Sequence, residues 1–194
     1  MTPTHQPRIA SVSPEAMTEE QKSVAALLES GPRGGVRGPF AVLLHSPRAF
    51  DCAQRLGAYL RYESALQADF RELAVLVTAR FWNQEYEWRA HSPLAEAAGV
   101  DRLAIDALAQ GQSPVTLSDE QRLIYEFCRQ LHTTNTVDDE IFGSVQALVG
   151  EQGLIDLCVV CGYYAMLAMV INVARNPPGE GLLPVMPAPH QEAQ

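Results

Sequence analysis

The sequence predicts an all-α protein of about eight helices, and three observations support this prediction. Apolar residues recur at the helical period of 3.6, as they do between Phe50 and Leu60. Residues that typically cap or stop helices stand at the ends of such segments. No stretch sustains the apolar and polar alternation that is typical of a strand. With 194 residues and 47% hydrophobic content, the chain suffices for one domain with a sizeable core.

The first helix is predicted to begin at Ser13-Pro14-Glu15, where a cap residue precedes a proline and an acid, and to run to about Glu29. The loop from Gly31 to Pro39 then ends it. Four glycines in this loop let the backbone approach closely either a ligand or a neighbouring helix. Ser46-Pro47 repeats the cap-and-proline pattern and predicts a second helix that runs to about Tyr62.

Six further helices are predicted, with short breaks between them. Gly99 is a typical stop signal after one of them, and Ser118 with Gln121 forms a capping box at the start of another. The predicted ranges are Gln67–Phe81, Gln84–Ala98, Asp101–Ala109, Asp119–His132, Asp138–Val149 and Leu154–Arg175.

Composition divides the chain into an N-terminal helix with its Gly-rich loop at 1–37, a helical domain at 38–175 and a Pro-rich tail at 176–194. The prolines of the tail exclude a regular helix from it. The tail also contains the apolar residues Leu182, Leu183, Val185 and Met186. Two interpretations follow: the tail is mobile, or it is an arm that lies on another subunit.

The charge pattern argues against nucleic acids and anionic membranes as partners. The formal net charge is -9, and no run rich in Lys or Arg offers a local exception. The longest apolar run, from Leu157 to Ile171, is shorter than the ~20 residues that span a bilayer, so we interpret it as a core helix. Residues 1–13 lack the apolar region of a secretion signal. We therefore expect a cytoplasmic protein.

The cysteines are expected to be reduced thiols, because four of them in a chain of this size without a secretion signal do not suggest a disulfide framework. Cys158 and Cys161 form a Cys-x-x-Cys inside the most apolar helix, where burial raises thiol pKa values and restricts access. We expect these two to serve packing. Cys52 and Cys128 also lie in helical patterns and are predicted to be core thiols.

The segment from Glu72 to His91 has the strongest functional signal, because it combines two carboxylates, an imidazole and several aromatic residues. Glu87 and His91 are one helical turn apart on one face, where a carboxylate can bind an imidazole. Asn83 is a plausible cap of their helix. Glu72 lies on the preceding helix, which could fold alongside, so two carboxylates could converge on one imidazole.

This cluster would be partly desolvated if Trp82, Tyr86 and Trp88 formed its walls, and its groups would then titrate away from their usual values, as acid–base catalysis requires. The alternatives are a solvated or merely structural pair, and aromatic residues that belong to the core. Glu-x-x-x-His with a distant Glu could also ligate iron, manganese or zinc. Because no second His stands at metal spacing, we expect neither a metal nor another cofactor.

These residues resemble the carboxymuconolactone decarboxylase family, which includes the AhpD-type alkylhydroperoxidases. The resemblance covers most of the chain and is carried by Gly38-Pro-Phe40, Leu44-His-Ser-Pro47, Arg71-Glu72-Leu-Ala74, Tyr86-Glu-Trp-Arg-Ala-His91 and Gly162-Tyr-Tyr-Ala-Met-Leu-Ala168. It implies an AhpD-like all-helical fold that assembles as homo-oligomers, with a pocket near a subunit interface.

The peroxidase branch of that family has a Glu, then Cys-x-x-Cys at the start of the next helix, then a His four residues after the second Cys. In this chain Glu72 matches the Glu and His91 matches the His, but the cysteine positions hold Gln84 and Glu87. Neither residue can form a thiolate or a disulfide, so the peroxidase cycle cannot run at these positions. The resemblance therefore implies the branch that lacks the peroxidase Cys-x-x-Cys.

The leading hypothesis is a decarboxylase-like enzyme without a cofactor, which performs acid–base chemistry (a decarboxylation or a related lyase or isomerase reaction) on a small carboxylated or lactone metabolite. His91 would be the general acid or base, Glu87 would orient it, and Glu72 would share or relay the proton. Arg80, Arg89 or Arg37 could hold a substrate carboxylate. The residues predicted to bind substrate are Trp82, Tyr86, Trp88, Arg80 and His45.

Two alternatives remain. The chain could be a binding or structural homologue that retained the helical oligomer, a dimer, trimer or hexamer, and lost catalysis. A catalytic site should bury its three groups around an accessible cavity, whereas a degenerate one should leave them solvated or filled. Alternatively, peroxidase activity could persist through the remaining cysteines, in which case thiol alkylation would abolish hydroperoxide turnover. We expect no such turnover.

Overall fold

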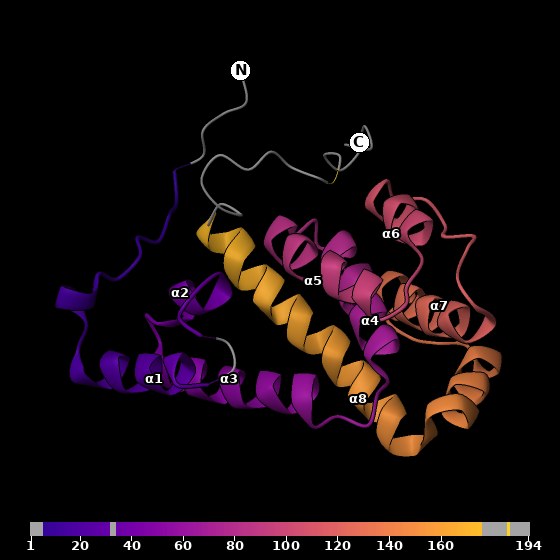
Figure 1. Ribbon diagram of the computed structural model, residues 1–194, viewed down its shortest axis with the longest axis horizontal. Helices are drawn as coiled ribbons and strands as arrows, with labels where there is room; N and C mark the ends of the chain where they lie inside the picture. The colour runs from indigo at the N-terminus through magenta and orange to yellow at the C-terminus, as the bar shows by residue number, and fades with distance from the viewer. Residues whose placement is uncertain (1–5, 32–33, 176–185, 187–194) are drawn as a thin grey trace.

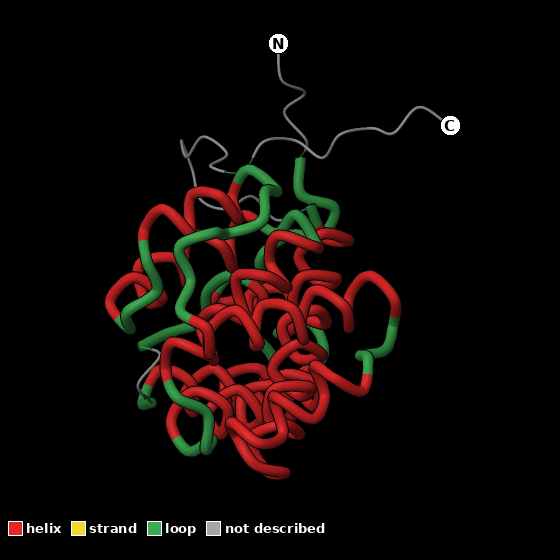
Figure 2. Tube along the Cα trace, turned by 90° about the vertical axis from the view of Figure 1, so that its right-hand side faces the viewer, coloured by secondary structure: helices red, strands yellow, loops and turns green. Residues whose placement is uncertain are grey.

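The protein is helical throughout the part of the chain that the computed structural model describes, which is residues 6–31, 34–175 and 186. Figures 1 and 2 show helices joined by short loops, with no strand in these residues. This confirms the all-α prediction and the number of α-helices. Their bounds are α1 Glu19–Glu29, α2 Pro39–Leu43, α3 Pro47–Tyr62, α4 Ala68–Phe81, α5 Glu85–Ala97, α6 Arg102–Ala109, α7 Asp119–Thr134 and α8 Asp139–Ala174.

Helix α4 is the centre of the packing. Every residue from Leu73 to Ala79 is buried, as expected for a helix that is apolar around its circumference. Helices α5, α6, α7 and α8 all pack against it. Helix α3 instead pairs with α1, and Figure 1 shows this pair on the other side of α8.

Helix α8 consists of two helical parts that meet at Gly150, as the separate predictions for Asp138–Val149 and Leu154–Arg175 imply. Gly150 has a φ of 71° and a ψ of 176°, a conformation that a residue with a Cβ rarely adopts. Figure 1 shows the change of direction where the orange ribbon turns into the long yellow segment. That segment then crosses the molecule, and α8 as a whole packs against α2, α3, α4 and α7.

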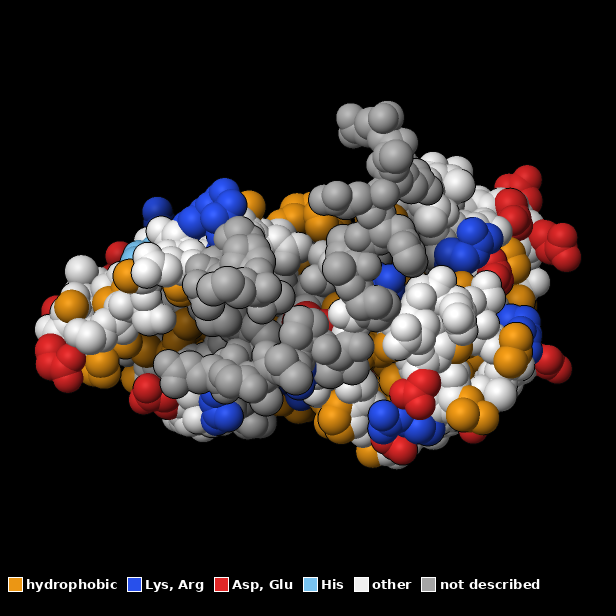
Figure 3. Space-filling view, turned by 90° about the horizontal axis from the view of Figure 1, so that it is seen from above, with side chains coloured by type: hydrophobic (Ala, Val, Ile, Leu, Met, Phe, Trp, Pro, Cys, Tyr) orange, Lys and Arg blue, Asp and Glu red, His pale blue; other side chains and the backbone are white. Residues whose placement is uncertain are grey.

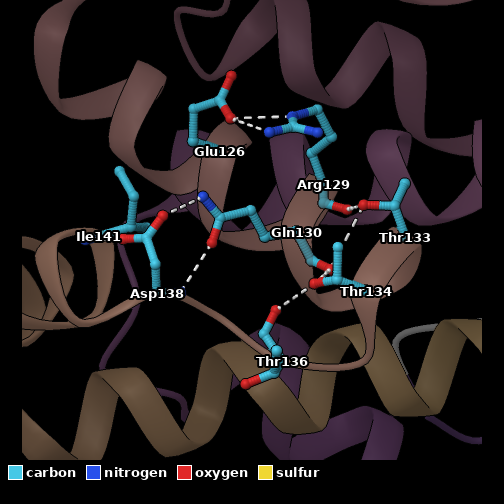
Figure 4. A network of polar contacts seen from close by, with 8 residues as sticks. All are labelled: Glu126, Arg129, Gln130, Thr133, Thr134, Thr136, Asp138 and Ile141. Carbon is cyan, nitrogen blue, oxygen red and sulfur yellow. Dashed lines mark hydrogen bonds and ion pairs between the residues drawn. The ribbon is translucent and has the colours of Figure 1, made fainter.

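The connection between α7 and α8 is closed by polar contacts (Figure 4). Asp138 caps α8 by accepting a hydrogen bond of 2.8 Å from the Ile141 amide. Gln130 reaches across from α7, because its amide group donates to the Asp138 carboxylate at 2.6 Å and accepts from the Asp138 backbone at 2.9 Å. Asn135, with a φ of 61°, turns the chain at the end of α7. These contacts fix the angle at which α8 begins.

The sequence predictions about the helices need correction at three points. The first helix does not run continuously from Ser13, because Pro14–Ala16 forms a separate 3-10 turn and Thr18 caps α1 with a capping box. Helix α2 was not predicted, since it has only five residues and follows Gly38. Asn83 is not the cap of α5 and instead occupies the turn before it, with a φ of 48°.

The close approach that the Gly-rich loop allows involves a neighbouring helix. At Gly38, which has a φ of 54°, an added Cβ would lie 2.2 Å from the ring of Tyr86 in α5. Gly38 therefore serves both the left-handed turn before α2 and the packing of the Tyr86 ring.

The predicted tail lies outside the described residues, apart from Met186. The backbone amide of Met186 donates to Glu85 at 2.7 Å, and its side chain is buried. This residue therefore rests on α5 of its own chain. The domain boundaries proposed from composition stay predictions. Helix α1 packs on α3, and its buried residues are Val24, Ala25 and Leu28.

Helix α8 is long and apolar enough to cross a membrane by length and composition alone. More than half of its most apolar window is buried within the protein, as expected for the predicted core helix. Figure 3 shows both acidic and basic side chains on the face seen from above, with acidic groups at its two ends. The cytoplasmic location stays a prediction.

Asp156 joins the long part of α8 to the end of α3. It is 4% exposed and accepts hydrogen bonds from the Tyr59 hydroxyl at 2.8 Å, the Ser64 hydroxyl at 2.8 Å and the Ala65 amide at 3.3 Å. A buried carboxylate that accepts several hydrogen bonds is compatible with a stable fold. Donors that lose this acceptor lower the stability of the fold.

We therefore expect Asp156→Ala to lower the free energy of unfolding by about 2 kcal/mol, because it leaves these donors without an acceptor. Urea denaturation followed by circular dichroism measures the change. The control is Asp51→Ala, which removes an i,i+4 surface pair with Arg55 and should cost clearly less than Asp156→Ala. Equal losses in the two variants would contradict the role of Asp156.

Candidate functional site

The structure brings the two predicted carboxylates onto one imidazole. Helix α4 supplies Glu72, and α5, which packs against it, supplies Glu87 and His91. The Nδ1 atom of His91 lies 2.6 Å from Glu72 Oε2, and its Nε2 atom lies 3.7 Å from Glu87 Oε2. All three residues are buried, with 3–4% exposure. The arrangement is therefore a desolvated cluster rather than a solvated surface pair.

Glu72 is held as a carboxylate despite its burial. Burial alone would raise its pKa, but the hydrogen bond and charge of His91, together with nearby Arg71, outweigh this effect and lower the pKa below its usual 4.5. The Arg71 Nε atom lies 3.3 Å from Glu72 Oε1. An ionised Glu72 accepts a hydrogen bond from Nδ1–H, and the Nε2 atom of His91 lies on the side of Glu87.

Tyr164 of α8 completes the buried side of the cluster. Its ring contacts the His91 ring edge to face, with the centroids 4.8 Å apart. Burial raises the pKa of the Tyr164 phenol, and the nearby negative charge of Glu87 raises it further. Tyr164 therefore stays neutral at physiological pH and positions the imidazole by packing.

A cavity of about 210 Å³ opens beside this cluster. Glu87 and His91 line it, whereas Glu72 lies behind the imidazole and does not. Two basic residues, Arg37 and Arg61, also line the cavity. The remaining lining residues are Gly35, Pro39, Phe40, Tyr62, Tyr86, Ala90, Tyr164 and Leu167. Acid–base groups and positive charge thus face the same small volume.

Of the five residues predicted to bind substrate, Tyr86 lines this cavity and four lie elsewhere. Trp88 is 2% exposed, belongs to the hydrophobic core and does not line the cavity. Trp82 ends α4 and its carbonyl accepts a hydrogen bond from Asn172. Arg80 lines a second cavity, and His45 is exposed and binds the Ala10 carbonyl at 2.8 Å.

Of the three arginines predicted to hold a substrate carboxylate, one lines the cavity and two lie elsewhere. Arg37 lines the cavity, whereas Arg89 pairs with Glu85 at 3.5 Å within α5. Sequence reasoning missed Arg61, because nothing in the local pattern at the end of α3 distinguishes it from a surface residue. It also missed Tyr164 as a contact of His91, although residues 162–168 belong to the family resemblance.

Gln84 and Glu87, at the two positions of the peroxidase cysteines, have different structural roles. Gln84 caps α5 by accepting from the Tyr86 amide at 2.8 Å, and its amide group donates to Asn172 at 2.7 Å. It is buried and does not line the cavity. Glu87 does line the cavity beside His91. The first position has become part of the helix cap, and the second carries an ionisable group.

The cysteines differ from the sequence prediction at two points. Cys52 is exposed rather than a core thiol. Burial raises the pKa of Cys158, as predicted, but the pKa of Cys161 is lowered, because a hydrogen bond with Cys128 and contacts with His132 outweigh its burial. Cys128 and Cys161 are buried.

Within the described residues, no group of three or more His, Cys, Asp or Glu side chains has the geometry to hold a metal ion. The expectation of a site without a metal or cofactor stays a prediction.

The fold thus holds a buried Glu–His–Glu cluster between α4 and α5. Residues 47–122 match the model of the Carboxymuconolactone decarboxylase family, which confirms the resemblance for the stretch that contains Glu72, Glu87 and His91. No curated protein matches the chain in sequence.

Two solved structures are similar to this chain over most of its length. One is an uncharacterized peroxidase-related protein from Silicibacter sp. TM1040, with a TM-score of 0.71 and 14% identity over 91% of this chain and 96% of that chain. The other is an alkylhydroperoxidase AhpD core protein, an uncharacterized peroxidase-related protein from Ralstonia eutropha JMP134, with a TM-score of 0.70 and 17% identity over 91% of this chain and 94% of that chain. These likenesses establish the AhpD-like fold.

Because the pKa of Glu72 is lowered in the folded state, its ionisation stabilises the fold above pH 4.5, and this stabilisation is lost as the pH falls through the folded-state pKa. We therefore expect Glu72→Gln to lower the free energy of unfolding by roughly 2 to 4 kcal/mol at pH 7. The difference from the wild type should shrink at pH values below 4.5. Urea denaturation across this pH range measures it.

The control variant is Glu151→Gln, at an exposed position of α8. It should change the stability by less than about 0.5 kcal/mol at every pH. A loss in Glu72→Gln that is the same at pH 7 and at pH 4 would contradict an ionised Glu72.

Proposed function

We propose that this protein is an enzyme without a cofactor that performs acid–base chemistry on a small carboxylated or lactone-type metabolite. The reaction is a decarboxylation or a related lyase or isomerase reaction. One observation carries the proposal: His91 and Glu87 line a cavity, while a buried carboxylate, Glu72, holds the imidazole from behind. This is the arrangement of a base with an orienting group, which acid–base catalysts require.

The roles follow from which groups face the cavity. Glu72 is a positioning residue, because its 2.6 Å contact fixes the orientation of the ring at Nδ1 and it does not reach the cavity. His91 is the general acid or base through Nε2. Glu87 lies 3.7 Å from that nitrogen and also faces the cavity, so it can share the proton with His91 or exchange it with the substrate. This assigns orientation to Glu72 rather than to Glu87.

The cavity favours a small anionic substrate. Its volume of about 210 Å³ is below the roughly 300 Å³ at which sites for drug-sized ligands begin. The guanidinium groups of Arg37 and Arg61 can bind a carboxylate or an enolate oxygen. The rings of Tyr62 and Tyr86 supply apolar surface beside them. Charge and shape thus agree with the proposed class of metabolite.

A decarboxylation uses these groups in two steps. The bond to the departing carboxylate breaks, carbon dioxide leaves, and the electron pair remains on the substrate as an enolate, which the arginines stabilise. Protonated His91 then transfers its Nε2 proton to the substrate carbon and regains a proton from water. No electrons are transferred to or from the protein, so the reaction needs neither an oxidant nor a reductant.

The geometry favours a catalytic site over a degenerate one. A degenerate homologue should leave the three groups solvated or fill the space between them, yet they are buried beside an accessible cavity. A non-catalytic binding protein stays the second candidate, because the same cavity could hold a ligand without reaction. A peroxidase cycle at positions 84 and 87 is disfavoured, since neither Gln84 nor Glu87 provides a thiol.

We expect His91→Ala to lower kcat/KM at least about 100-fold on any substrate found in a panel of small lactones and carboxylic acids. Carbon dioxide release and lactone absorbance are the measurements. His45→Ala is the matched control and should leave kcat/KM unchanged, because the exposed His45 lies away from the cavity. Full activity in His91→Ala would refute the assignment. Binding by the wild type without turnover would favour the second candidate.

We also propose that the protein forms homo-oligomers through one face of α8. Along that face Ile155, Met166, Met169 and Val173 are 37–63% exposed, and they recur at helical spacing on one side of the helix. Gly162 lies between them and leaves open space. An exposed apolar stripe of this length is typical of an interface between proteins.

We expect the wild type to be a dimer, trimer or hexamer in light scattering coupled to gel filtration. Met169→Glu combined with Val173→Glu should raise its dissociation constant at least about tenfold, because both carboxylates would be buried in the interface. Val115→Glu is the control, since Val115 is 78% exposed and lies in a loop away from α8. A monomeric wild type would contradict the proposal.

A further inference from the structure

A second cavity, of about 340 Å³, lies between α4, α6 and α7. Helices α6 and α7 are on the opposite side of the molecule from α1 (Figure 1). No described residue lines both this cavity and the one beside His91. Its volume exceeds the roughly 300 Å³ at which sites for drug-sized ligands begin. The second cavity is therefore separate from the acid–base site and large enough for a ligand of its own.

Much of the wall of the second cavity is apolar. Val77 and Leu108 belong to the core and also line the cavity. Phe81 is 45% exposed there, although its ring stacks on His132 with the centroids 4.9 Å apart. The Nε2 atom of that imidazole is already engaged, because it lies 2.9 Å from the buried hydroxyl of Thr78. A partly exposed aromatic ring beside a cavity is typical of a surface that an apolar ligand covers.

Arg80 supplies a positive charge to this cavity that no acid of the described residues compensates. Its Nη1 atom donates to the side chain of Asn83, and its Nε atom is buried without a hydrogen-bond partner in the same part of the chain. The cavity is also lined by Arg129, which pairs with Glu126 at 2.8 Å (Figure 4). A guanidinium group has further N–H donors in a planar arrangement that matches a carboxylate. Arg80 is therefore the group that would bind an anion.

The end of α6 fixes the position of this guanidinium group. The amides of Gly111 and Gln112 donate to the carbonyls of Leu108 and Ala107 at 2.9 Å each, which is the Schellman arrangement, and Gly111 has the left-handed φ of 72° that it requires. An added Cβ at Gly111 would lie 3.0 Å from the Nη2 atom of Arg80. The guanidinium group thus lies against this turn before any ligand binds, which lowers the entropy cost of binding.

We propose that the second cavity is a binding site for a monocarboxylate with an apolar chain, such as a medium-chain fatty acid. The carboxylate pairs with Arg80, and the chain lies against Phe81 and the neighbouring apolar wall. A carboxylate carries the single negative charge that compensates one guanidinium group, whereas a phosphate group carries more. The formal net charge of -9 also disfavours ligands with several negative charges.

The test is a titration of the full-length protein with sodium octanoate in isothermal titration calorimetry. The wild type should bind one octanoate per chain. Arg80→Gln should raise the Kd at least about tenfold, because the charged hydrogen bonds to the carboxylate are lost. Arg129→Gln is the matched control and should change the Kd less than about threefold, since that arginine is already paired. No binding at millimolar octanoate, or an unchanged Kd in Arg80→Gln, would overturn the proposal.

Two further variants show which cavity holds octanoate. Phe81→Ala should raise the Kd at least about threefold, because the chain loses apolar contact area, and the exposed position of Phe81 makes the change tolerable for the fold. Arg61→Gln removes a guanidinium group from the cavity beside His91 and should leave the Kd unchanged. A loss of affinity in Arg61→Gln but not in Arg80→Gln would place octanoate beside His91 and overturn the proposal.

Analogues of octanoate test the chemistry of the ligand. Octanol retains the chain without the charge, and butanoate retains the charge with half of the chain. Each should bind at least about tenfold more weakly than octanoate. Octyl phosphate should also bind more weakly, because one guanidinium group compensates only part of its charge. Octanol or octyl phosphate that binds as tightly as octanoate would overturn the assignment of a carboxylate.

A crystal structure of the wild type with octanoate covers the case in which Arg80→Gln does not fold, since that change also removes the contact with Asn83. The octanoate carboxylate should lie within hydrogen-bond distance of the Arg80 guanidinium group, with the chain against Phe81. Octanoate bound only at other positions would overturn the proposal. These outcomes do not depend on the acid–base proposal, because neither Arg80 nor Phe81 lines the cavity beside His91.

Discussion

The structure depends on one carboxylate inside its most buried helix. Glu72 lies in α4, which is enclosed by four other helices, and an unpaired charge there would cost several kcal/mol. Its negative charge is retained because Arg71 and the imidazole of His91 supply compensating contacts. His91 can reach Glu72 only if α5 packs alongside α4. The same contact that compensates the buried charge therefore also fixes the register of two helices and turns Nε2 of the imidazole toward Glu87.

Most of the fold could be predicted from the sequence, because helical periodicity and caps are local signals. The capping box at Ser118 and the stop at Gly99 are present as expected. Helix α2 was missed because five residues after a glycine carry almost no periodic signal. Within the site, the spacing of Glu87 and His91 was sufficient to predict their shared face. Arg61 and the Cys128–Cys161 contact come from distant segments that only tertiary packing brings together.

Two buried acids precede apolar segments of the chain, Glu72 in α4 and Asp156 in α8. The role of each carboxylate depends on the groups that donate hydrogen bonds to it. Asp156 accepts hydrogen bonds from the hydroxyl groups of Tyr59 and Ser64 and from the Ala65 amide, so it joins the long part of α8 to the end of α3. Glu72 accepts from an imidazole whose other nitrogen faces a cavity. A carboxylate that holds an imidazole beside a cavity can influence proton transfer at that ring, whereas the contacts of Asp156 hold two helices together.

Gly38 gives the loop before α2 an influence on the shape of the cavity beside His91. A methyl group at this position would overlap the ring of Tyr86, so the ring can stay where it is only because residue 38 has no side chain. Tyr86 is also a wall of the cavity beside His91, and a displaced ring would move into or out of that space. The shape of the cavity thus depends on a position that is not among its lining residues, and relatives with a larger residue there would be expected to have a cavity of a different shape.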